Sequence, residues 1–192
     1  MNDFFLATGL VALAEVADKT QLLAFFLAAQ FRRPWPIIWG ILVATLANHA
    51  LAGAVGMGLA QWLGADLLRW ILGLGFIAMG AWMLIPDKLE APDEASGKRL
   101  GVFGTTVVAF FLAEMGDKTQ VATVALAAQS ASAYLVVLGT TLGMMIANVP
   151  AVLVGDRLAN RLSPKWMHRI AAALFFCIGI FVLQGFSVDF LT

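Results

Sequence analysis

Long apolar runs, separated by short polar stretches, set the pattern of this sequence. Each run is long enough for a helix that crosses the roughly 30 Å apolar layer of a membrane, which takes about 20 residues. The pattern therefore predicts an all-α integral membrane protein with six transmembrane helices and almost no part outside the membrane. The six runs lie at about residues 4–30, 36–63, 67–86, 102–129, 134–156 and 167–186.

The composition agrees with a membrane protein. The 192 residues are 61% hydrophobic and only 12% charged, whereas a soluble domain carries about 25% charged residues. The start of the chain lacks the basic segment and cleavage site of a signal peptide. The net charge of zero says nothing about partners, but the sequence shows no basic patch, no P-loop and no Ser/His/Asp set, so we expect neither a nucleic-acid partner nor an enzyme.

The basic residues are unevenly distributed between the predicted loops. Because Lys and Arg accumulate on the cytoplasmic side of membrane proteins, this distribution predicts that both termini lie on the non-cytoplasmic side. The opposite set of loops holds only Arg69. The cytoplasmic loops would hold nine basic residues: Arg32, Arg33, Lys88, Lys98, Arg99, Arg157, Arg161, Lys165 and Arg169.

The two halves of the chain repeat each other with an offset of 99 residues. The stretch "LAEVADKTQ" (13–21) aligns with "LAEMGDKTQ" (112–120), and "LAAQ" follows at the same distance in both halves. Because each half holds three predicted helices, the second must enter the membrane from the opposite side, as in the inverted repeats of many transporters. We therefore expect a single transport domain, which needs no oligomer. Its parts are a first repeat at 1–86, a cytoplasmic linker at 87–101 and a second repeat at 102–192.

Four acidic residues lie about halfway along two of the apolar runs: Glu15, Asp18, Glu114 and Asp117. In each copy the Glu and Asp are three residues apart, so on a continuous helix they would share one face. Helices running in opposite directions would bring the four carboxylates together at the membrane midplane. A charge there costs at least about 2.5–3.5 kcal/mol, so it is seldom present without a partner or a task. These four residues are the predicted metal ligands.

Lys19 and Lys118 follow the two Glu residues by four positions, the spacing of a helical ion pair. If all four acids were ionised, two negative charges would remain in excess. A divalent cation or two protons would restore neutrality, which is the charge balance expected of a cation–proton exchanger. The alternative is that each Glu–Lys pair is only a structural bridge, but the repetition and the excess acid disfavour it.

Neighbouring oxygen donors extend the predicted site. Hard divalent ions such as Mn²⁺, Ca²⁺ and Mg²⁺ favour oxygen ligands, and the absence of Cys and His from the motifs disfavours Zn²⁺ or Cu⁺. For the asparagines, hydrogen bonding between helices is an alternative role. His49 fits a hydrogen-bonded packing residue better than a proton relay. The candidate further ligands are Thr20, Gln21, Thr119, Gln120, Asn48 and Asn148.

The motif "EMGDKT" (114–119) fits the E-x-G-D-[KR]-[ST] signature of the Gdt-type, MneA-like manganese/calcium transporters, and the chain resembles this family over its whole length. The resemblance implies that the four acids bind the cation. It also implies that Mn²⁺ leaves the cytoplasm across a bacterial plasma membrane, with no catalytic cofactor; eukaryotic members carry Mn²⁺ or Ca²⁺ into Golgi or chloroplast compartments. The first copy departs from the signature at Ala17, where local unwinding is less favourable than at Gly116.

Two other classes of protein share features with this sequence. "GD" within a helix is similar to intramembrane aspartyl proteases, but these need two aspartates that share a proton, and the adjacent Lys and Glu residues disfavour such a pair. A passive cation channel or a small-metabolite exporter would fit the same size. Dependence of transport on a counterion separates an exchanger, with H⁺ as the expected counterion, from a channel. The sequence leaves the choice between Mn²⁺ and Ca²⁺ open.

Overall fold

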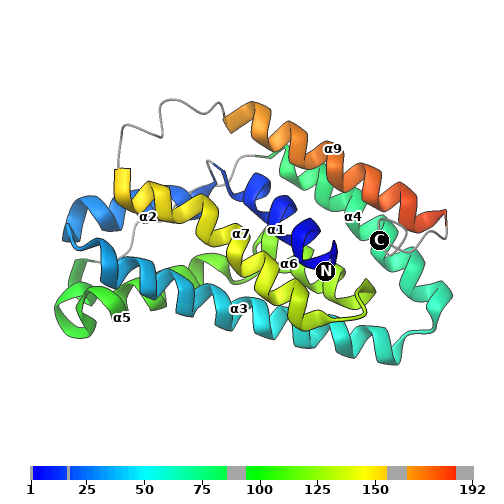
Figure 1. Ribbon diagram of the computed structural model, residues 1–192, viewed down its shortest axis with the longest axis horizontal. Coiled ribbons are helices and arrows are strands. Elements are labelled where there is room, and N and C mark those ends of the chain that lie inside the picture. The colour runs from blue at the N-terminus through cyan, green and yellow to red at the C-terminus, as the bar shows by residue number, and fades with distance from the viewer. Residues whose placement is uncertain (1, 17, 86–93, 155–163, 185–192) are drawn as a thin grey trace.

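The described part of the chain is built from helices. The computed structural model describes residues 2–16, 18–85, 94–154 and 164–184. Every regular element within these ranges is helical, so the predicted all-α class is confirmed. In chain order the helices are α1 (Asn2–Glu15), α2 (Lys19–Phe31), α3 (Pro34–Trp62), α4 (Ala65–Met83), α5 (Glu94–Glu114), α6 (Lys118–Gln129), α7 (Ala133–Val154) and α9 (Pro164–Leu183) (Figure 1).

Three helical segments among the described residues are each long and apolar enough to cross a membrane: Pro34–Trp62, Asp66–Met83 and Ala133–Leu153. A fourth span results if the bent pair Leu100–Glu114 and Lys118–Gln129 counts as one. Many large apolar side chains on these helices are exposed, which is expected where the solvent is lipid.

Two of the six predicted helices are not continuous. The run at 4–30 is divided between α1 and α2, and the run at 102–129 is divided between α5 and α6. In addition, α5 begins inside the predicted linker and contains a non-helical residue at Gly101, with φ 67° and ψ 173°. The prediction of uninterrupted helices at these two runs is therefore wrong, although the helix pairs α1–α2 and α5–α6 cover both runs.

Corresponding helices of the two halves run in opposite directions. In Figure 1, α1 and α2 run from right to left, whereas α5 and α6 run from left to right. The long helices behave in the same way, since α3 runs from left to right and α7 from right to left. α4 and α9 also run in opposite directions and lie side by side.

Close contacts between the halves occur in reciprocal pairs. A Cβ atom at Gly40 of α3 would lie 2.7 Å from the Cβ of Thr106 of α5. A Cβ atom at Gly139 of α7 would lie 3.1 Å from the Cβ of Ala7 of α1. The 99-residue offset relates the two contacts, since Gly139 corresponds to Gly40 and Thr106 corresponds to Ala7. Such exchange of partners is the property of an interface with two-fold symmetry.

The contact between α4 and α9 follows the same rule. A Cβ atom at Gly80 would lie 3.0 Å from the carbonyl oxygen of Ala172, and one at Gly179 would lie 2.8 Å from that of Gly73. Here too the 99-residue offset relates the two contacts, since Gly179 corresponds to Gly80 and Ala172 corresponds to Gly73. Glycine at these positions lets the helix backbones approach closely, as is usual between membrane helices.

The buried apolar side chains form two clusters. One includes Phe76, Leu126 and Phe175 and draws on α1, α4, α6, α7 and α9. The other includes Leu27 and Phe110 and draws on α2, α3, α5 and α7. Since α1 and α6 contribute to the first cluster and α2 and α5 to the second, the chain passes from one cluster to the other at each helix break. The acidic motifs lie at these two crossings.

Candidate cation site

Both copies of the acidic motif lie at a helix break. α1 ends at Glu15 and α2 begins at Lys19, while α5 ends at Glu114 and α6 begins at Lys118. The α5–α6 pair is bent by 71°. The Glu and the Asp of a motif therefore belong to different helices, and the prediction that they share one helix face is wrong.

The residue types explain why the helices break here. Asp18 and Asp117 occupy the N-cap positions of α2 and α6 with extended backbone, φ −84° and −78°. Asp is favoured there because its carboxylate accepts from amides of the first turn, as Asp117 does from the Thr119 amide at 3.5 Å. Gly116 has φ 74°, a conformation that ends many helices and costs glycine little. Ala17 lies outside the described residues, yet the break occurs in its copy as well.

The backbone turns in the same way at both breaks. The amide of Asp18 donates to the carbonyl of Glu15 at 3.1 Å, and the amide of Asp117 donates to that of Glu114 at 3.0 Å. The carbonyl of each Asp then accepts from the amide four residues further on. The two halves thus present each Glu and Asp on equivalent backbone.

Three carboxylates from the two halves meet in the interior. One carboxylate oxygen each from Glu15, Glu114 and Asp117 lies within 4.8 Å of the others. We call these three residues the acid cluster; their side chains are at most 2% exposed. Asp18 is also buried, at 4% exposure, but it is not part of this group. The structure therefore brings together three of the four predicted acids.

A threonine of each motif holds one oxygen of each glutamate. The hydroxyl of Thr20 donates to Oε2 of Glu15, and that of Thr119 lies 3.3 Å from Oε2 of Glu114 and equally far from Oδ2 of Asp117. The other oxygen of each Glu, Oε1, is buried without a hydrogen-bond partner among the described residues. The threonines thus orient the carboxylates and leave one oxygen of each Glu available.

The two lysines have different environments. Nζ of Lys19 forms an ion pair with Oδ1 of Asp117 at 2.8 Å, which links the two halves. Nζ of Lys118, a residue only 2% exposed, donates to the carbonyl of Ile85 at 2.8 Å. Because each helix breaks between its Glu and its Lys, the predicted Glu-to-Lys pairing within one helix is wrong.

Amide side chains stabilise the second break. Gln120 accepts from the amide of Gly116 at 2.7 Å and donates to Oδ1 of Asn48 at 2.8 Å. Asn48, on α3, donates in turn to the carbonyl of Phe111 at 2.9 Å. Both ends of the Asn48 and Gln120 amides are thus engaged with the protein, which agrees with the alternative role of asparagine in bonds between helices.

The corresponding residues of the first copy are arranged differently. Gln21 donates to the backbone carbonyl of Ala147 at 2.9 Å, and Ala147 occupies the position that Asn48 has in the first half. Asn148 donates to the carbonyl of Met144 at 3.0 Å, while its Oδ1 is buried without a partner among the described residues. Asn148 therefore keeps a free oxygen that Asn48 lacks.

His49 is a further buried polar residue next to the motifs. It is fully buried on α3, and neither ring nitrogen has a hydrogen-bond partner within the described part of the chain. The expectation of a hydrogen-bonded packing histidine is therefore wrong. The sequence places His49 beside Asn48 on a predicted helix, but no pattern in it indicates that the ring lacks a partner.

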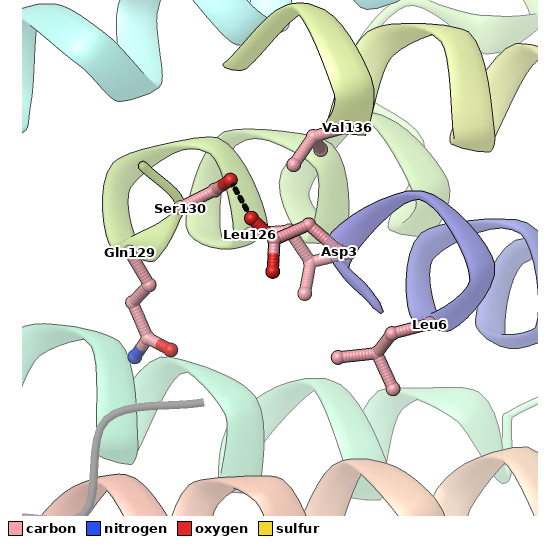
Figure 2. A pocket seen from close by; sticks show the side chains of 6 residues that line it. All are labelled: Asp3, Leu6, Leu126, Gln129, Ser130 and Val136. Carbon is pink, nitrogen blue, oxygen red and sulfur yellow. Dashed lines mark hydrogen bonds between the residues drawn. The ribbon is translucent and has the colours of Figure 1, made fainter. Parts of the chain in front are cut away.

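A small pocket lies away from the acid cluster, at the start of α1 and the end of α6. Figure 2 shows Asp3 and Ser130 pointing toward one another, and the Ser130 hydroxyl donates to the Asp3 carboxylate. At 1.5 Å per residue, Asp3 is about 18 Å along α1 from Glu15, so this pocket is separate from the acid cluster. It is lined by Asp3, Leu6, Leu126, Gln129, Ser130 and Val136.

The chemistry of the acid cluster suits a hard divalent cation. All its donors are carboxylate oxygens, the ligands preferred by Mn²⁺, Ca²⁺ and Mg²⁺. Three buried carboxylates this close repel one another, and the ion pair of Lys19 with Asp117 offsets part of this repulsion. Binding of a cation or of protons would relieve the repulsion.

Comparison with known proteins agrees with this chemistry. The chain matches the protein family described as "Divalent cation/proton antiporter GDT1" over residues 3–91 and 102–188. No solved structure matches the chain.

Three relatives illustrate the range of similarity. A protein of Vibrio cholerae named "Putative manganese exporter" is 48% identical over 171 residues, which cover 88% of this chain and 84% of the relative. The "GDT1-like protein sll0615" of Synechocystis is 30% identical, over 89% of this chain and 91% of the relative. The "Divalent cation/proton antiporter GDT1" of Saccharomyces cerevisiae is 22% identical, over 98% and 86%.

Proposed function

Because the chain belongs to the GDT1 family of divalent cation/proton antiporters, we propose that it exports Mn²⁺ from the cytoplasm in exchange for protons. The name and high identity of the Vibrio cholerae relative support Mn²⁺ as the cation. The single observation that carries the proposal is the acid cluster, in which buried carboxylates from both halves lie within 4.8 Å of one another.

The ligands in this proposal are the three residues of the acid cluster together with Asp18. The free Oε1 atoms of Glu15 and Glu114 support direct binding by the glutamates. Thr20 and Thr119 orient the carboxylates through their hydroxyls. Of the other candidates, Asn148 has an uncommitted oxygen, whereas Asn48, Gln120 and Gln21 hold the helix breaks in place through hydrogen bonds.

Exchange follows from competition for the same oxygens. Four acids and the two lysines of the motifs leave an excess of two negative charges, which either one divalent cation or two protons neutralise. A neutralised site can cross a low-dielectric interior at much lower cost than a charged one. An inward proton gradient would then drive the cation outward.

Alternating access in this proposal comes from movement of one half against the other. We propose six spans arranged as two inverted repeats, 1–86 and 102–192, joined by a cytoplasmic linker at 87–101. The opposite helix directions and the reciprocal glycine contacts support this arrangement. The first and fourth spans would be the broken pairs α1–α2 and α5–α6, which carry the site.

The proposed location is a bacterial plasma membrane with both termini on the non-cytoplasmic side. The support is the excess of Lys and Arg in one set of loops. Single cysteines introduced at Ala95 and Asp189, in a Cys177→Ala background, should react with a membrane-impermeant reagent from opposite sides. Reaction of both from the same side would refute the inverted arrangement.

Flux in proteoliposomes tests the function. With an imposed pH gradient, the protein should move Mn²⁺ against protons, and Glu114→Gln should not. Calorimetric titration with Mn²⁺ in two buffers of different ionisation enthalpy should count released protons. A count of zero, with flux indifferent to the pH gradient, would make a passive channel the better interpretation.

A further inference from the structure

Four polar side chains on α3 and α7 are buried and carry atoms without a hydrogen-bond partner in the described structure. They are Thr45 and His49 on α3, through Oγ1 and both ring nitrogens, and Thr141 and Asn148 on α7, through Oγ1 and Oδ1. None is more than 5% exposed. We call these four residues the neutral seam. A buried polar atom without a partner costs about 1–3 kcal/mol, so several together indicate a ligand that the protein itself does not supply.

The neutral seam follows the contact between α3 and α7. These helices run antiparallel (Figure 1), and a Cβ atom at Gly53 would lie 2.6 Å from Cγ2 of Val137. One turn back along α3 is His49, and one turn forward along α7 is Thr141, so these two lie at the same level. Thr45 lies one turn further back along α3, and Asn148 lies two turns further forward along α7.

The neutral seam is next to both motifs. The residue that precedes His49 accepts a hydrogen bond from Gln120 of the second motif, and the residue that precedes Asn148 accepts one from Gln21 of the first. His49 is not a member of the acid cluster, so its ring nitrogens are possible metal ligands distinct from the three carboxylates.

We propose that the neutral seam is an approach site for the divalent cation beside the acid cluster, and that the imidazole of His49 makes this site prefer Mn²⁺ to Ca²⁺. The inference rests on the proposed function. The donor atoms of the neutral seam carry no negative charge, so they hold a cation less strongly than carboxylates do. Weaker binding suits a site that the ion must leave. Hydroxyl and amide oxygens bind hard divalent ions alike, whereas imidazole nitrogen binds transition-metal ions and Ca²⁺ takes oxygen ligands.

The repeat supplies a matched substitution. His49 corresponds to Asn148 through the 99-residue offset, so the second half already holds a carboxamide at the equivalent position. His49→Asn therefore replaces a nitrogen donor by an oxygen donor and keeps a polar side chain. His168→Asn, which removes the other of the two histidines of the chain, is the control.

Selectivity is the first measurement. Uptake of Mn²⁺ and of Ca²⁺ into proteoliposomes should show a ratio that falls about tenfold in His49→Asn and is unchanged in His168→Asn. A merely structural role would slow both ions together and leave the ratio unchanged.

The hydroxyls are tested by two neighbouring threonines. Thr141→Val should slow Mn²⁺ and Ca²⁺ alike, because an oxygen donor common to both ions is lost. Thr140→Val is the control, since the Thr140 hydroxyl already donates to the carbonyl of Val136 at 3.0 Å. Equal fluxes in the two variants would contradict a role for the Thr141 oxygen.

Pulsed electron paramagnetic resonance, with Mn²⁺ in excess over the purified protein, is the third measurement. Coupling of Mn²⁺ to a ligand nitrogen should be present in the wild type and in His168→Asn, and absent in His49→Asn. An unchanged ion ratio in His49→Asn, or bound Mn²⁺ without nitrogen coupling in the wild type, would overturn the inference while leaving the proposed function intact. Absence of Mn²⁺ flux in the wild type would contradict both.

Discussion

The first motif ends α1 at Glu15 and begins α2 after Asp18, and the second ends α5 at Glu114 and begins α6 after Asp117. The backbone hydrogen bonds that close the two turns are the same. The side chains differ, because both glutamates enter the acid cluster but only the aspartate of the second motif does so. The shared backbone thus places equivalent carboxylates, and the local partners decide which of them meet.

The partners of the second motif differ from those of the first. Asp117 forms an ion pair with Lys19 of the other half, and the backbone amide of Gly116 donates a hydrogen bond to the side chain of Gln120. In the first copy, Gln21 bonds to a backbone carbonyl of α7 instead. Equivalent backbone turns therefore carry different side-chain contacts, and substitutions at equivalent positions should show which contacts matter in both motifs and which in one.

Neutralising the glutamates should have the largest effect. Glu15→Gln and Glu114→Gln should each lower Mn²⁺ flux by about a hundredfold or more, because each removes a buried carboxylate of the acid cluster that we propose binds the cation. Proteoliposome flux measures the loss. Asp66→Asn is the control, since this acid at the start of α4 is 95% exposed. Full flux in both glutamate variants would end the ligand hypothesis.

The aspartates should differ from each other. Asp117→Asn should reduce Mn²⁺ flux about tenfold more than Asp18→Asn, because Asp117 belongs to the acid cluster, caps α6 and pairs with Lys19. Flux should be compared with thermal unfolding of the same variants in detergent, so that loss of a helix cap is separated from loss of a ligand. Equal losses would mean that the two aspartates contribute alike during transport.

Reciprocal glycines test the two-fold relation. Gly40→Ala and Gly139→Ala should each destabilise the fold by about 1–3 kcal/mol, since the added Cβ overlaps the helix of the other half in both cases. Denaturant unfolding in detergent measures the effect. Gly58→Ala is the control, because nothing lies within 4 Å of a Cβ there. Destabilisation by only one of the two would contradict equivalent packing.

The smallest effect is expected at the end pocket. Ser130→Ala removes the hydrogen bond to Asp3 and should cost about 0.5–1.5 kcal/mol, with little change in ion selectivity. The measurement is thermal unfolding together with the ratio of Mn²⁺ to Ca²⁺ flux. A changed ratio would indicate that this end of the molecule also selects the ion.

Much of the fold could be predicted from the pattern of apolar residues. The runs at 36–63, 67–86 and 134–156 correspond to α3, α4 and α7, because a continuous apolar stretch of this length has no stable alternative in lipid to a helix. The breaks at the two motifs were missed. Gly116 followed by Asp117 combines a residue that ends helices with one that begins them, so this signal was present, but the apolar residues on either side favoured one helix.

The sequence by itself determined the repeat, the identity of the acids and the oxygen-rich chemistry of the site, since these depend only on which residues recur at which spacing. Only the tertiary structure decided that Glu15, Glu114 and Asp117 meet, and that Lys19 pairs across the halves. It also decided that the His49 ring has no hydrogen-bond partner among the described residues. The physical reason is that such contacts depend on where two helices cross and how they are rotated. Those quantities follow from the packing of many small residues, such as Gly40 against Thr106, and no short stretch of sequence contains them.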